Sequence, residues 1–263
     1  MFFRRLAAPS AVILLLTTAL SGGLGPSAQA EPGVVAVVVP TVLAEIPHDP
    51  DAYSEGLEFD GGDLYEATGL VGRSELRQLN PGTGAVLRSV ALPGNYFGEG
   101  ITVAGDTIWQ LTYQDGVVIE WDKATLTERR EIPLPGEAWG LCDLGGRFVV
   151  SDGSGRLRFY DPATWAETGS VTVTRDGSEV TGLNELDCVG GQVWAALWPT
   201  DQIARIDPAT GAINLVVDVS GLWKFGERSA AQVFSGIAHI GGPEFLLSGK
   251  NWPSMFRVSI PGA

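Results

Sequence analysis

Residues 98–134 read GEGITVAGDTIWQLTYQDGVVIEWDKATLTERREIPL, and this stretch shows one complete unit of a repeat. It contains four short segments separated by tight polar turns, at residues 100–103, 107–111, 117–121 and 128–134, of which the first three are mainly apolar. Short apolar segments bounded by Gly and Asp are typical of β-strands joined by hairpins. The stretch therefore predicts four antiparallel strands that follow one another along the chain.

The motif at the start of this unit occurs five times in the sequence. An outward-reaching residue is followed by a small or polar one and then by Leu or Ile, at Glu55-Gly56-Leu57, Glu99-Gly100-Ile101, Trp139-Gly140-Leu141, Asn184-Glu185-Leu186 and Ser235-Gly236-Ile237. The starts are 40 to 51 residues apart, with a Gly-rich hairpin signal after each. This spacing is typical of the four-stranded blades of a propeller. The sequence predicts an all-β fold, a five-bladed β-propeller of four-stranded antiparallel blades.

A turn of one kind recurs between the third and fourth strands. It is Asn80-Pro81-Gly82-Thr83-Gly84 in the first unit, and related turns begin at Asp122, Asp161 and Asp207. Asp or Asn at the start of such a turn caps the following backbone N–H groups. We interpret these turns as structural.

The last unit ends after its third strand, at residues 255–260. The β-branched run Val34 to Ile46 has no partner in its own part of the sequence, so we expect it to pair into the last blade. Such closure removes open sheet edges. One propeller domain over residues 31–263 results.

The first thirty residues have the features of a secretory signal peptide. Arg4 and Arg5 precede an apolar run at residues 11–20, and Ala28-Gln29-Ala30 supplies a small-x-small cleavage site. The run is shorter than the roughly 20 residues that span a bilayer, so a membrane anchor is the less favoured alternative. We expect residues 1–30 to be removed and the mature chain to be secreted or periplasmic, with no membrane association after cleavage.

The chain is acidic, with 31 Asp and Glu against 17 Lys and Arg and a formal net charge of −14. Such a field repels phosphate backbones and anionic lipid heads, so nucleic acid is a poor candidate partner. The simpler meaning of the charge is solubility. We expect a monomer.

Two cysteines occur, Cys142 and Cys188, each just after the start of neighbouring repeats. In an exported chain they are a candidate disulfide between two blades, and two unpaired buried thiols are the alternative. A catalytic thiol would need a basic partner, and the two histidines, His48 and His239, lie in other parts of the sequence.

In a propeller, the residue before the first strand and the loop after the second strand of each blade reach the same face. The first kind of position holds Glu55, Glu99, Trp139, Asn184 and Ser235, and the second holds Thr68, Tyr113, Asp152, Trp198 and Lys250. Carboxylates, an amide, a lysine and aromatic rings on one face have the composition of a ligand pocket.

Taken singly, these residues have simpler explanations. Glu99 could be a solvated loop acid, Trp139 and Trp198 could pack between blades, and Lys250 could lie on the surface. Glu185, in a slot that holds Gly in the other four repeats, could point into a satisfied polar network below the pocket. Their shared register favours a pocket, because independent residues would not be expected to align.

The sequence contains few of the residue patterns that bind a catalytic metal ion. It has no HExxH motif and no Cys pair at zinc spacing, and a calcium site of carboxylates is not signalled. No Ser-His-Asp set can be assembled. What remains is a carboxylate able to move a proton and a Lys/Asn pair able to hold an oxyanion, with no cofactor expected.

At these residues the sequence resembles the plant and bacterial glutamine cyclotransferases, the five-bladed type of glutaminyl-peptide cyclotransferase. The resemblance runs from about residue 46 to 260 through ordered motifs, which include Tyr53-Ser54-Glu55-Gly56-Leu57, Tyr96-Phe97-Gly98-Glu99-Gly100, Leu183-Asn184-Glu185-Leu186 and Gly249-Lys250-Asn251-Trp252-Pro253. It implies an aminoacyltransferase that converts the N-terminal glutamine of peptides or proteins into pyroglutamate with release of ammonia, without a metal.

The resemblance also implies residue roles. The family's acid/base glutamate matches Glu99, and its amide and lysine match Asn184 and Lys250. The residues that match or replace its substrate-binding set are Tyr53, Glu55, Phe97, Tyr113, Trp139 and Trp198. The family usually has Phe and Gln at the positions of Tyr53 and Glu55, Trp at Tyr113 and Asn at Ser235, so these departures bear on substrate preference.

A competing interpretation is a secreted propeller that binds a peptide, a sugar or a protein and does no chemistry, because one fold hosts many functions. A pure binder has no need of the Glu99, Asn184 and Lys250 set. A metal-dependent propeller hydrolase is a second rival, which would lose its activity on chelation.

Overall fold

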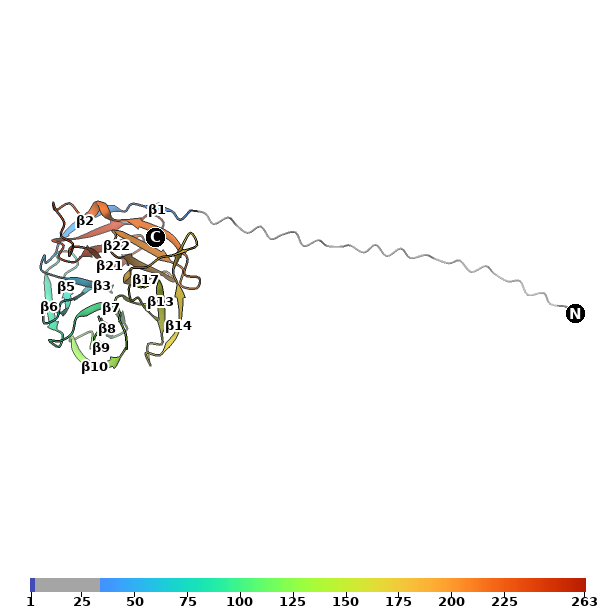
Figure 1. Ribbon diagram of the computed structural model, residues 1–263, viewed down its shortest axis with the longest axis horizontal. Coiled ribbons are helices and arrows are strands. Elements are labelled where there is room, and N and C mark those ends of the chain that lie inside the picture. The colour runs from blue at the N-terminus through green and yellow to red at the C-terminus, as the bar shows by residue number, and fades with distance from the viewer. Residues whose placement is uncertain (3–33) are drawn as a thin grey trace. The chain divides into compact units, whose positions relative to one another are not determined.

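The computed structural model describes residues 1–2 and 34–263, and residues 34–263 form one compact unit. Apart from its first two residues, the predicted signal peptide lies outside the described residues. The unit is a ring of five antiparallel sheets (Figure 1). Among the described residues, the single helix is the short 3₁₀ turn η1 (Ser220–Leu222), and no helix is long and apolar enough to cross a membrane.

Each of the first three blades is a four-stranded sheet built from consecutive strands. Blade 1 has β3 (Ser54–Asp60), β4 (Asp63–Thr68), β5 (Glu75–Leu79) and β6 (Val86–Ala91). Blade 2 has β7 (Gly98–Ala104), β8 (Thr107–Thr112), β9 (Val117–Asp122) and β10 (Thr127–Pro133). Blade 3 has β11 (Leu141–Asp143), β12 (Phe148–Val150), β13 (Arg156–Tyr160) and β14 (Glu167–Thr172).

The last two blades are completed by strands from the beginning of the chain. Blade 4 has β17 (Leu183–Val189), β18 (Gln192–Leu197), β19 (Gln202–Ile206), β20 (Ile213–Asp218) and the added β1 (Val37–Val38). Blade 5 has β21 (Phe234–Gly241), β22 (Glu244–Gly249), β23 (Ser254–Ser259) and the outer β2 (Thr41–Pro47). A small hairpin of β15 (Thr174–Arg175) and β16 (Ser178–Glu179) lies between blades 3 and 4 in the chain.

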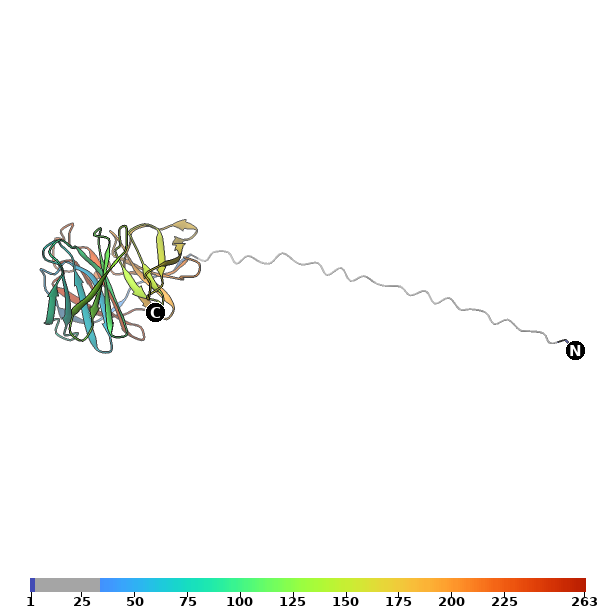
Figure 2. The ribbon, with the colours of Figure 1, turned by 90° about the horizontal axis from the view of Figure 1, so that it is seen from below.

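The four strands of the second repeat appear where the sequence predicts them, within two residues at each end. Figure 1 shows β3, β7, β17 and β21 around the centre of the ring and β6, β10 and β14 at its rim. Seen from below, the strands of the blades cross the thickness of the ring (Figure 2). The predicted five-bladed fold is therefore confirmed.

Ring closure follows the prediction in part. β2 pairs antiparallel with β23, so the start of the propeller supplies the missing strand of the last blade. The prediction of one continuous run from Val34 to Ile46 is wrong, because Val37 and Val38 leave that sheet and pair parallel with β20 of blade 4. Pro40 separates the two strands. Its missing N–H and fixed φ account for the break.

Glycine at the second position of the repeat lets the innermost strands approach one another. A Cβ on Gly100 would lie 2.7 Å from the carbonyl oxygen of Trp139, and one on Gly140 would lie 2.2 Å from that of Asn184. These distances exclude any side chain at either position. The repeated Gly therefore draws the blades together around the axis and fixes where the residue before it projects.

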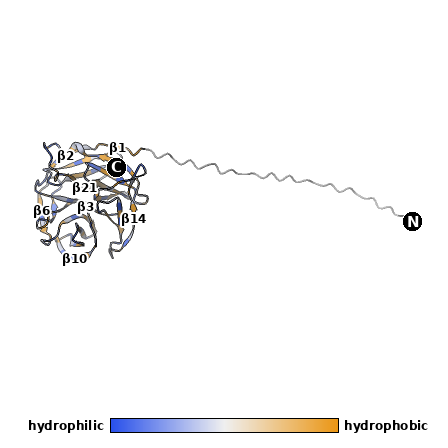
Figure 3. Ribbon diagram, in the orientation of Figure 1, coloured by the Kyte–Doolittle hydropathy of each residue, from blue (hydrophilic) through white to orange (hydrophobic). Residues whose placement is uncertain are grey.

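Five clusters of buried apolar side chains fill the five interfaces between neighbouring blades. Trp194, Phe245 and Trp252, for example, pack between blades 4 and 5. Apolar and polar residues are interspersed through every blade (Figure 3), as expected for strands that bury side chains between blades and expose their outer edges. The core is thus distributed around the ring and holds each inner strand in register with its neighbours.

The recurring turns take the predicted conformation. The side-chain oxygens of Asn80, Asp122, Asp161 and Asp207 each accept hydrogen bonds from backbone N–H groups two or three residues later, at 2.8 to 3.1 Å. These turns lie between the third and fourth strands, away from the pocket described below.

Candidate active site

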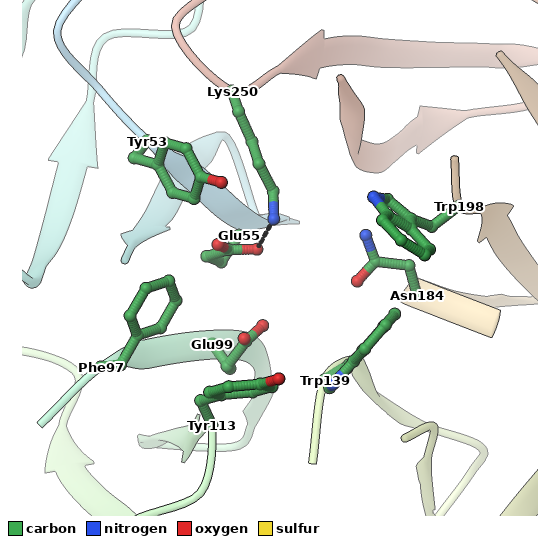
Figure 4. Close-up of a pocket in the computed structure, with 9 residues that line it drawn as sticks. All are labelled: Tyr53, Glu55, Phe97, Glu99, Tyr113, Trp139, Asn184, Trp198 and Lys250. Atoms are coloured by element: carbon green, nitrogen blue, oxygen red, sulfur yellow. Dashed lines mark ion pairs between the residues drawn. The ribbon is translucent and has the colours of Figure 1, made fainter. Parts of the chain in front are cut away.

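One face of the ring has a pocket of about 270 Å³ at its centre. The nine residues that the sequence singles out as catalytic or substrate-binding all line it (Figure 4): Tyr53, Glu55, Phe97, Glu99, Tyr113, Trp139, Asn184, Trp198 and Lys250. They come from all five blades, so the pocket exists only in the closed ring.

The repeat explains how these side chains meet. Glu55, Glu99 and Asn184 lie at or beside the N-terminal ends of the innermost strands β3, β7 and β17, and Trp139 lies two residues before β11. Tyr113 and Trp198 directly follow the second strands β8 and β18, and Lys250 directly follows β22. Antiparallel pairing brings both kinds of position to the same end of each blade.

Three residues in the predicted register do not line the pocket. Thr68 bonds through its hydroxyl to the backbone of Glu75, and Asp152 accepts hydrogen bonds from Ser154. Ser235 is fully buried. The expectation that these three would face the ligand is therefore wrong, since the first two stabilise the turns in which they lie.

The glycines that follow Thr68 and Asp152 make room for two aromatic side chains of the site. A Cβ on Gly69 would lie 2.4 Å from the Phe97 ring, and a Cβ on Gly153 would lie 2.6 Å from the Trp139 ring. Glycine at these points leaves room for the two aromatic walls. A Gly shortly after the second strand, directly after β4 for Gly69 and three residues after β12 for Gly153, was the sequence signal that could have identified these two positions.

A buried ion pair crosses the seam between the first and last blades. Lys250 Nζ lies 2.6 Å from Glu55 Oε2, and the side chain of Glu55 is 1% exposed (Figure 4). Burial lowers the pKa of Lys250, but the charges of Glu55 and Glu99 outweigh it and raise the pKa. The lysine is therefore a permanent cation at the floor of the pocket.

Glu55 and Glu99 are two carboxyl groups within hydrogen-bonding reach of each other. Burial raises the pKa of Glu55 to about 7, against the opposing effect of Lys250. Burial and then the charge of Glu55 raise the pKa of Glu99 well above its ordinary value. Both shifts favour retention of a proton by the pair near neutral pH, and the ion pair with Lys250 favours negative charge on Glu55 rather than on Glu99.

Aromatic rings form the walls. Phe97 packs edge-on against Tyr53, with ring centroids 6.2 Å apart, and against Tyr113 at 5.7 Å. On the other side, Trp139 and Trp198 pack edge to face at 6.0 Å. Trp198 is 45% exposed, so it stands at the mouth, where it can contact a ligand that extends outward.

Asn184 is buried and directs its side-chain amide toward the centre of the pocket (Figure 4). The next residue, Glu185, points away from the ligand. Its Oε1 accepts the backbone N–H of Leu57 at 3.0 Å, while its Oε2 is buried with no hydrogen-bond partner among the described residues. The expectation of a satisfied polar network is therefore met at one of the two oxygens only.

The loop that carries Lys250 is fixed to the segment before β3. The backbone N–H of Asn251 donates to the carbonyl of Ala52 at 2.7 Å, and its side-chain amide donates to the carbonyl of Pro50 at 3.0 Å. The N–H of His48 donates to the carbonyl of Pro253 at 2.9 Å. These bonds set the distance between Lys250 and Glu55.

Sequence reasoning missed two groups behind the site. Glu137 accepts a hydrogen bond from Trp139 Nε1 at 2.7 Å, and its position two residues before the repeat start was the available signal. His48 Nε2 lies 2.8 Å from Glu66 Oε1, which also accepts the Ser54 hydroxyl at 2.6 Å. The contact of His48 with Glu66 joins residues at different positions of the repeat, and no local sequence pattern predicts it.

Cys142 and Cys188 form a disulfide that joins β11 of blade 3 to β17 of blade 4. Both strands are innermost strands of neighbouring blades. The bond therefore links two blades that each contribute to the pocket. Within residues 1–2 and 34–263, no group of three or more His, Cys, Asp or Glu side chains is placed to hold a metal ion.

Fold and pocket together define a class of protein: a five-bladed β-propeller whose axial pocket combines paired carboxyl groups, a lysine and an amide within aromatic walls. Comparison with known proteins agrees. The sequence profile of the glutamine cyclotransferase family matches residues 14–260. The chain belongs to the glutamine cyclotransferase family, as the sequence resemblance predicts.

Two relatives illustrate the similarity. Glutaminyl-peptide cyclotransferase of Arabidopsis thaliana is 35% identical over 229 residues, which cover 84% of this chain and 71% of that protein. The crystal structure of Myxococcus xanthus glutaminyl cyclase matches with a TM-score of 0.78 and 33% identity, over 87% of this chain and 98% of that one.

Proposed function

We propose that this chain is a glutaminyl-peptide cyclotransferase, which converts the N-terminal glutamine of peptides or proteins into pyroglutamate and releases ammonia. The observation that carries the proposal is the convergence of Glu99, Asn184 and Lys250 in one aromatic-walled pocket. Membership of the glutamine cyclotransferase family supports it. A propeller that only binds a ligand has no need to bury two carboxyl groups beside a lysine.

Binding comes first. The glutamine side chain must fold back so that its γ-amide carbon meets its own α-amine in five-membered-ring geometry. The rings of Phe97, Trp139 and Trp198 enclose a space suited to this compact conformer and exclude water, which would compete by hydrolysing the amide. The rest of the peptide leaves through the mouth past Trp198.

The bond-forming step creates a negative charge on the γ-carbonyl oxygen. The α-amine nitrogen attacks the γ-carbon, and the carbonyl electrons move onto oxygen. Lys250 has N–H groups left after its contact with Glu55, and the Asn184 amide points to the same space. Both can donate hydrogen bonds to the oxyanion, and such donors are among the larger contributors to catalysis.

Proton transfer completes the reaction. Glu99 delivers its proton to the departing amide nitrogen, so the C–N bond breaks with release of neutral ammonia, and the resulting Glu99 carboxylate takes the surplus proton from the attacking nitrogen, now part of the ring. Glu99 is 5% exposed, and its Oε2 is buried without a hydrogen-bond partner among the described residues. Because Glu99 also lines the pocket, its carboxyl group can reach a bound substrate.

The proposal extends to the setting of the enzyme. The features of residues 1–30 support export, with action outside the cytoplasm as a secreted or periplasmic protein. The net charge of −14 argues against nucleic acid as a partner. We propose that the mature chain acts as a monomer, without a membrane and without a metal or other cofactor.

The experiment is an ammonia-release assay on a Gln-initiated dipeptide, with the pyroglutamyl product confirmed by mass spectrometry. The mature chain is expected to turn over this substrate, and a chelator is expected to leave the rate unchanged. No turnover of any Gln-initiated peptide by folded protein would overturn the function. Loss of activity with chelator and its return with a divalent metal would overturn the metal-free mechanism.

A further inference from the structure

The second carboxyl group, Glu55, has no part in the mechanism above, although it is buried within reach of Glu99. A single glutamate is enough to shuttle one proton. Burial of a further ionisable group has an energetic cost, which its contact with Lys250 offsets only while Glu55 is charged. Glu55 therefore calls for a role of its own.

Resting on the proposed function, we propose that Glu55 is a positioning residue for the reacting proton: its charged carboxylate, held by Lys250, keeps that proton on Glu99 and so matches Glu99 to the α-amine of the substrate. The geometry is asymmetric. Lys250 Nζ lies 2.6 Å from Glu55 Oε2, whereas none of the ion pairs among the described residues involves Glu99. The lysine thus stabilises charge on Glu55, and the remaining proton goes to Glu99.

A similar proton affinity of Glu99 and the substrate's α-amine favours the reaction, because proton transfer is most efficient between groups of similar proton affinity. An α-amino group in a peptide has a pKa of about 7.7–8.0, well above that of an ordinary glutamate at about 4.3. Like charge from Glu55 raises the pKa of Glu99 toward the amine. The substrate and Glu99 can then exchange a proton in either direction at neutral pH.

Other charged and titratable groups face Glu99 from each element packed around it. Lys250, after β22, lowers the pKa of Glu99, and Glu137, in the loop before β11, raises it. Tyr53, before β3, and Tyr113, after β8, are phenols whose own pKa values burial raises, so they stay neutral. Glu55 ranks above all of these charges in its effect on Glu99.

The test compares wild type with Glu55→Gln, a change that keeps the shape but removes the charge. kcat/KM for one Gln-initiated peptide is measured from about pH 4.5 to 9. We expect the acid limb of the profile to move to lower pH by about one unit or more in Glu55→Gln. Because the reacting complex holds one proton between Glu99 and the α-amine, the limb at lower pH follows Glu99 and the limb at higher pH follows the amine, which the substitution does not change and which serves as an internal reference.

Glu120→Gln is the matched control, because it removes one carboxylate from blade 2 at an ion pair with Arg130 outside the pocket. Its profile should coincide with wild type. An unmoved acid limb in Glu55→Gln overturns the proposal. Folded Glu55→Gln protein without activity at any pH also overturns it, because Glu55 would then take part in the chemistry itself.

A second measurement separates this inference from the proposed function. Infrared difference spectra of ligand-free protein, wild type minus Glu99→Gln, should show a protonated carboxyl band at pH 7. In the Glu55→Gln background, the same difference should show a carboxylate. If both backgrounds give the same protonation state, the inference fails even when the enzyme is active. If wild type makes no pyroglutamate, the function fails while the spectra still locate the proton.

Discussion

Replacing Glu99 with glutamine tests the proposed chemistry at the group that carries it. Glutamine has nearly the shape and hydrogen-bonding reach of glutamate but cannot accept a proton as a base. Glu99 is buried at the innermost strand of blade 2, and its side chain lines the pocket. The ion pair of Lys250 with Glu55 does not involve Glu99, so the oxyanion donor stays in place.

The expected fall in kcat follows from the loss of the general acid/base group. A positioned general acid or base contributes about 10²–10⁴ in rate, so kcat should fall by roughly a hundredfold or more. KM should change by less than about threefold, because the aromatic walls and the groups that hold the substrate's backbone are unaltered. A fall in kcat with a nearly constant KM is the signature of an interaction made mainly in the transition state.

The assay is steady-state ammonia release from one Gln-initiated peptide, at a fixed pH on the plateau of the wild-type profile. Glu120→Gln, the same substitution outside the pocket, controls for a general effect of removing a carboxylate. Near-normal kcat in Glu99→Gln would refute the assignment. The candidates for the acid/base group would then be Glu55 and Glu185, which are also buried carboxyl groups near the axis.

Three further outcomes are expected. Thiol titration of denatured, unreduced protein should find no free thiols, and Cys142→Ser with Cys188→Ser should lower the free energy of unfolding by about 2–4 kcal/mol without loss of turnover; two free thiols would exclude the bond. Trp198→Ala should raise KM more than it lowers kcat, and the reverse pattern would place that ring in the chemistry. The third outcome concerns His48 and Glu66. Burial lowers the pKa of His48, but its contact with Glu66 outweighs burial and raises it, whereas the same contact lowers the pKa of Glu66 against burial. The histidine's contribution to stability is therefore lost as pH rises through its raised pKa, and the glutamate's as pH falls below about 4.3. The gap in Tm between wild type and Glu66→Gln should be largest between about pH 5 and 6.5 and smaller at pH 9, and a gap that does not vary with pH would contradict the pairing.

The fold could be predicted because its signals are local and repeated. Four of the five blades have a Gly where inner strands approach, and four have an Asp or Asn at the turn before the outer strand. Both signals are visible in the letters of a 40- to 51-residue repeat. The parallel strand β1 could not be predicted, since two residues carry no periodicity and their partner, β20, lies at the far side of the sequence. Pro40 was the one visible sign that the run would break.

The pocket could be predicted as a set of residues but not as a chemical state. Register brings seven of the lining side chains to one face, the family resemblance adds Tyr53 and Phe97, and the structure places all nine in the pocket. Charge and protonation depend on contacts between blades, such as Lys250 Nζ with Glu55 Oε2, and on burial, neither of which a repeat reveals. Thr68 and Asp152 show that register alone does not place a side chain in the pocket. Both occupy the predicted positions, but hydrogen bonds within their own turns keep their side chains out of it.

Ring closure and chemistry meet at the same seam. Glu55 belongs to the first blade and Lys250 to the last, and the segment between β2 and β3 is hydrogen-bonded to residues 251 and 253 on the other side. The contact of His48 with Glu66 is buried directly behind this junction. A local opening of the seam would separate Lys250 from Glu55, and with it the oxyanion donor from the carboxyl pair, while the other blade interfaces stay packed. Because local opening requires less free energy than global unfolding, activity should be lost before the fold when the protein is heated or when β2 is weakened.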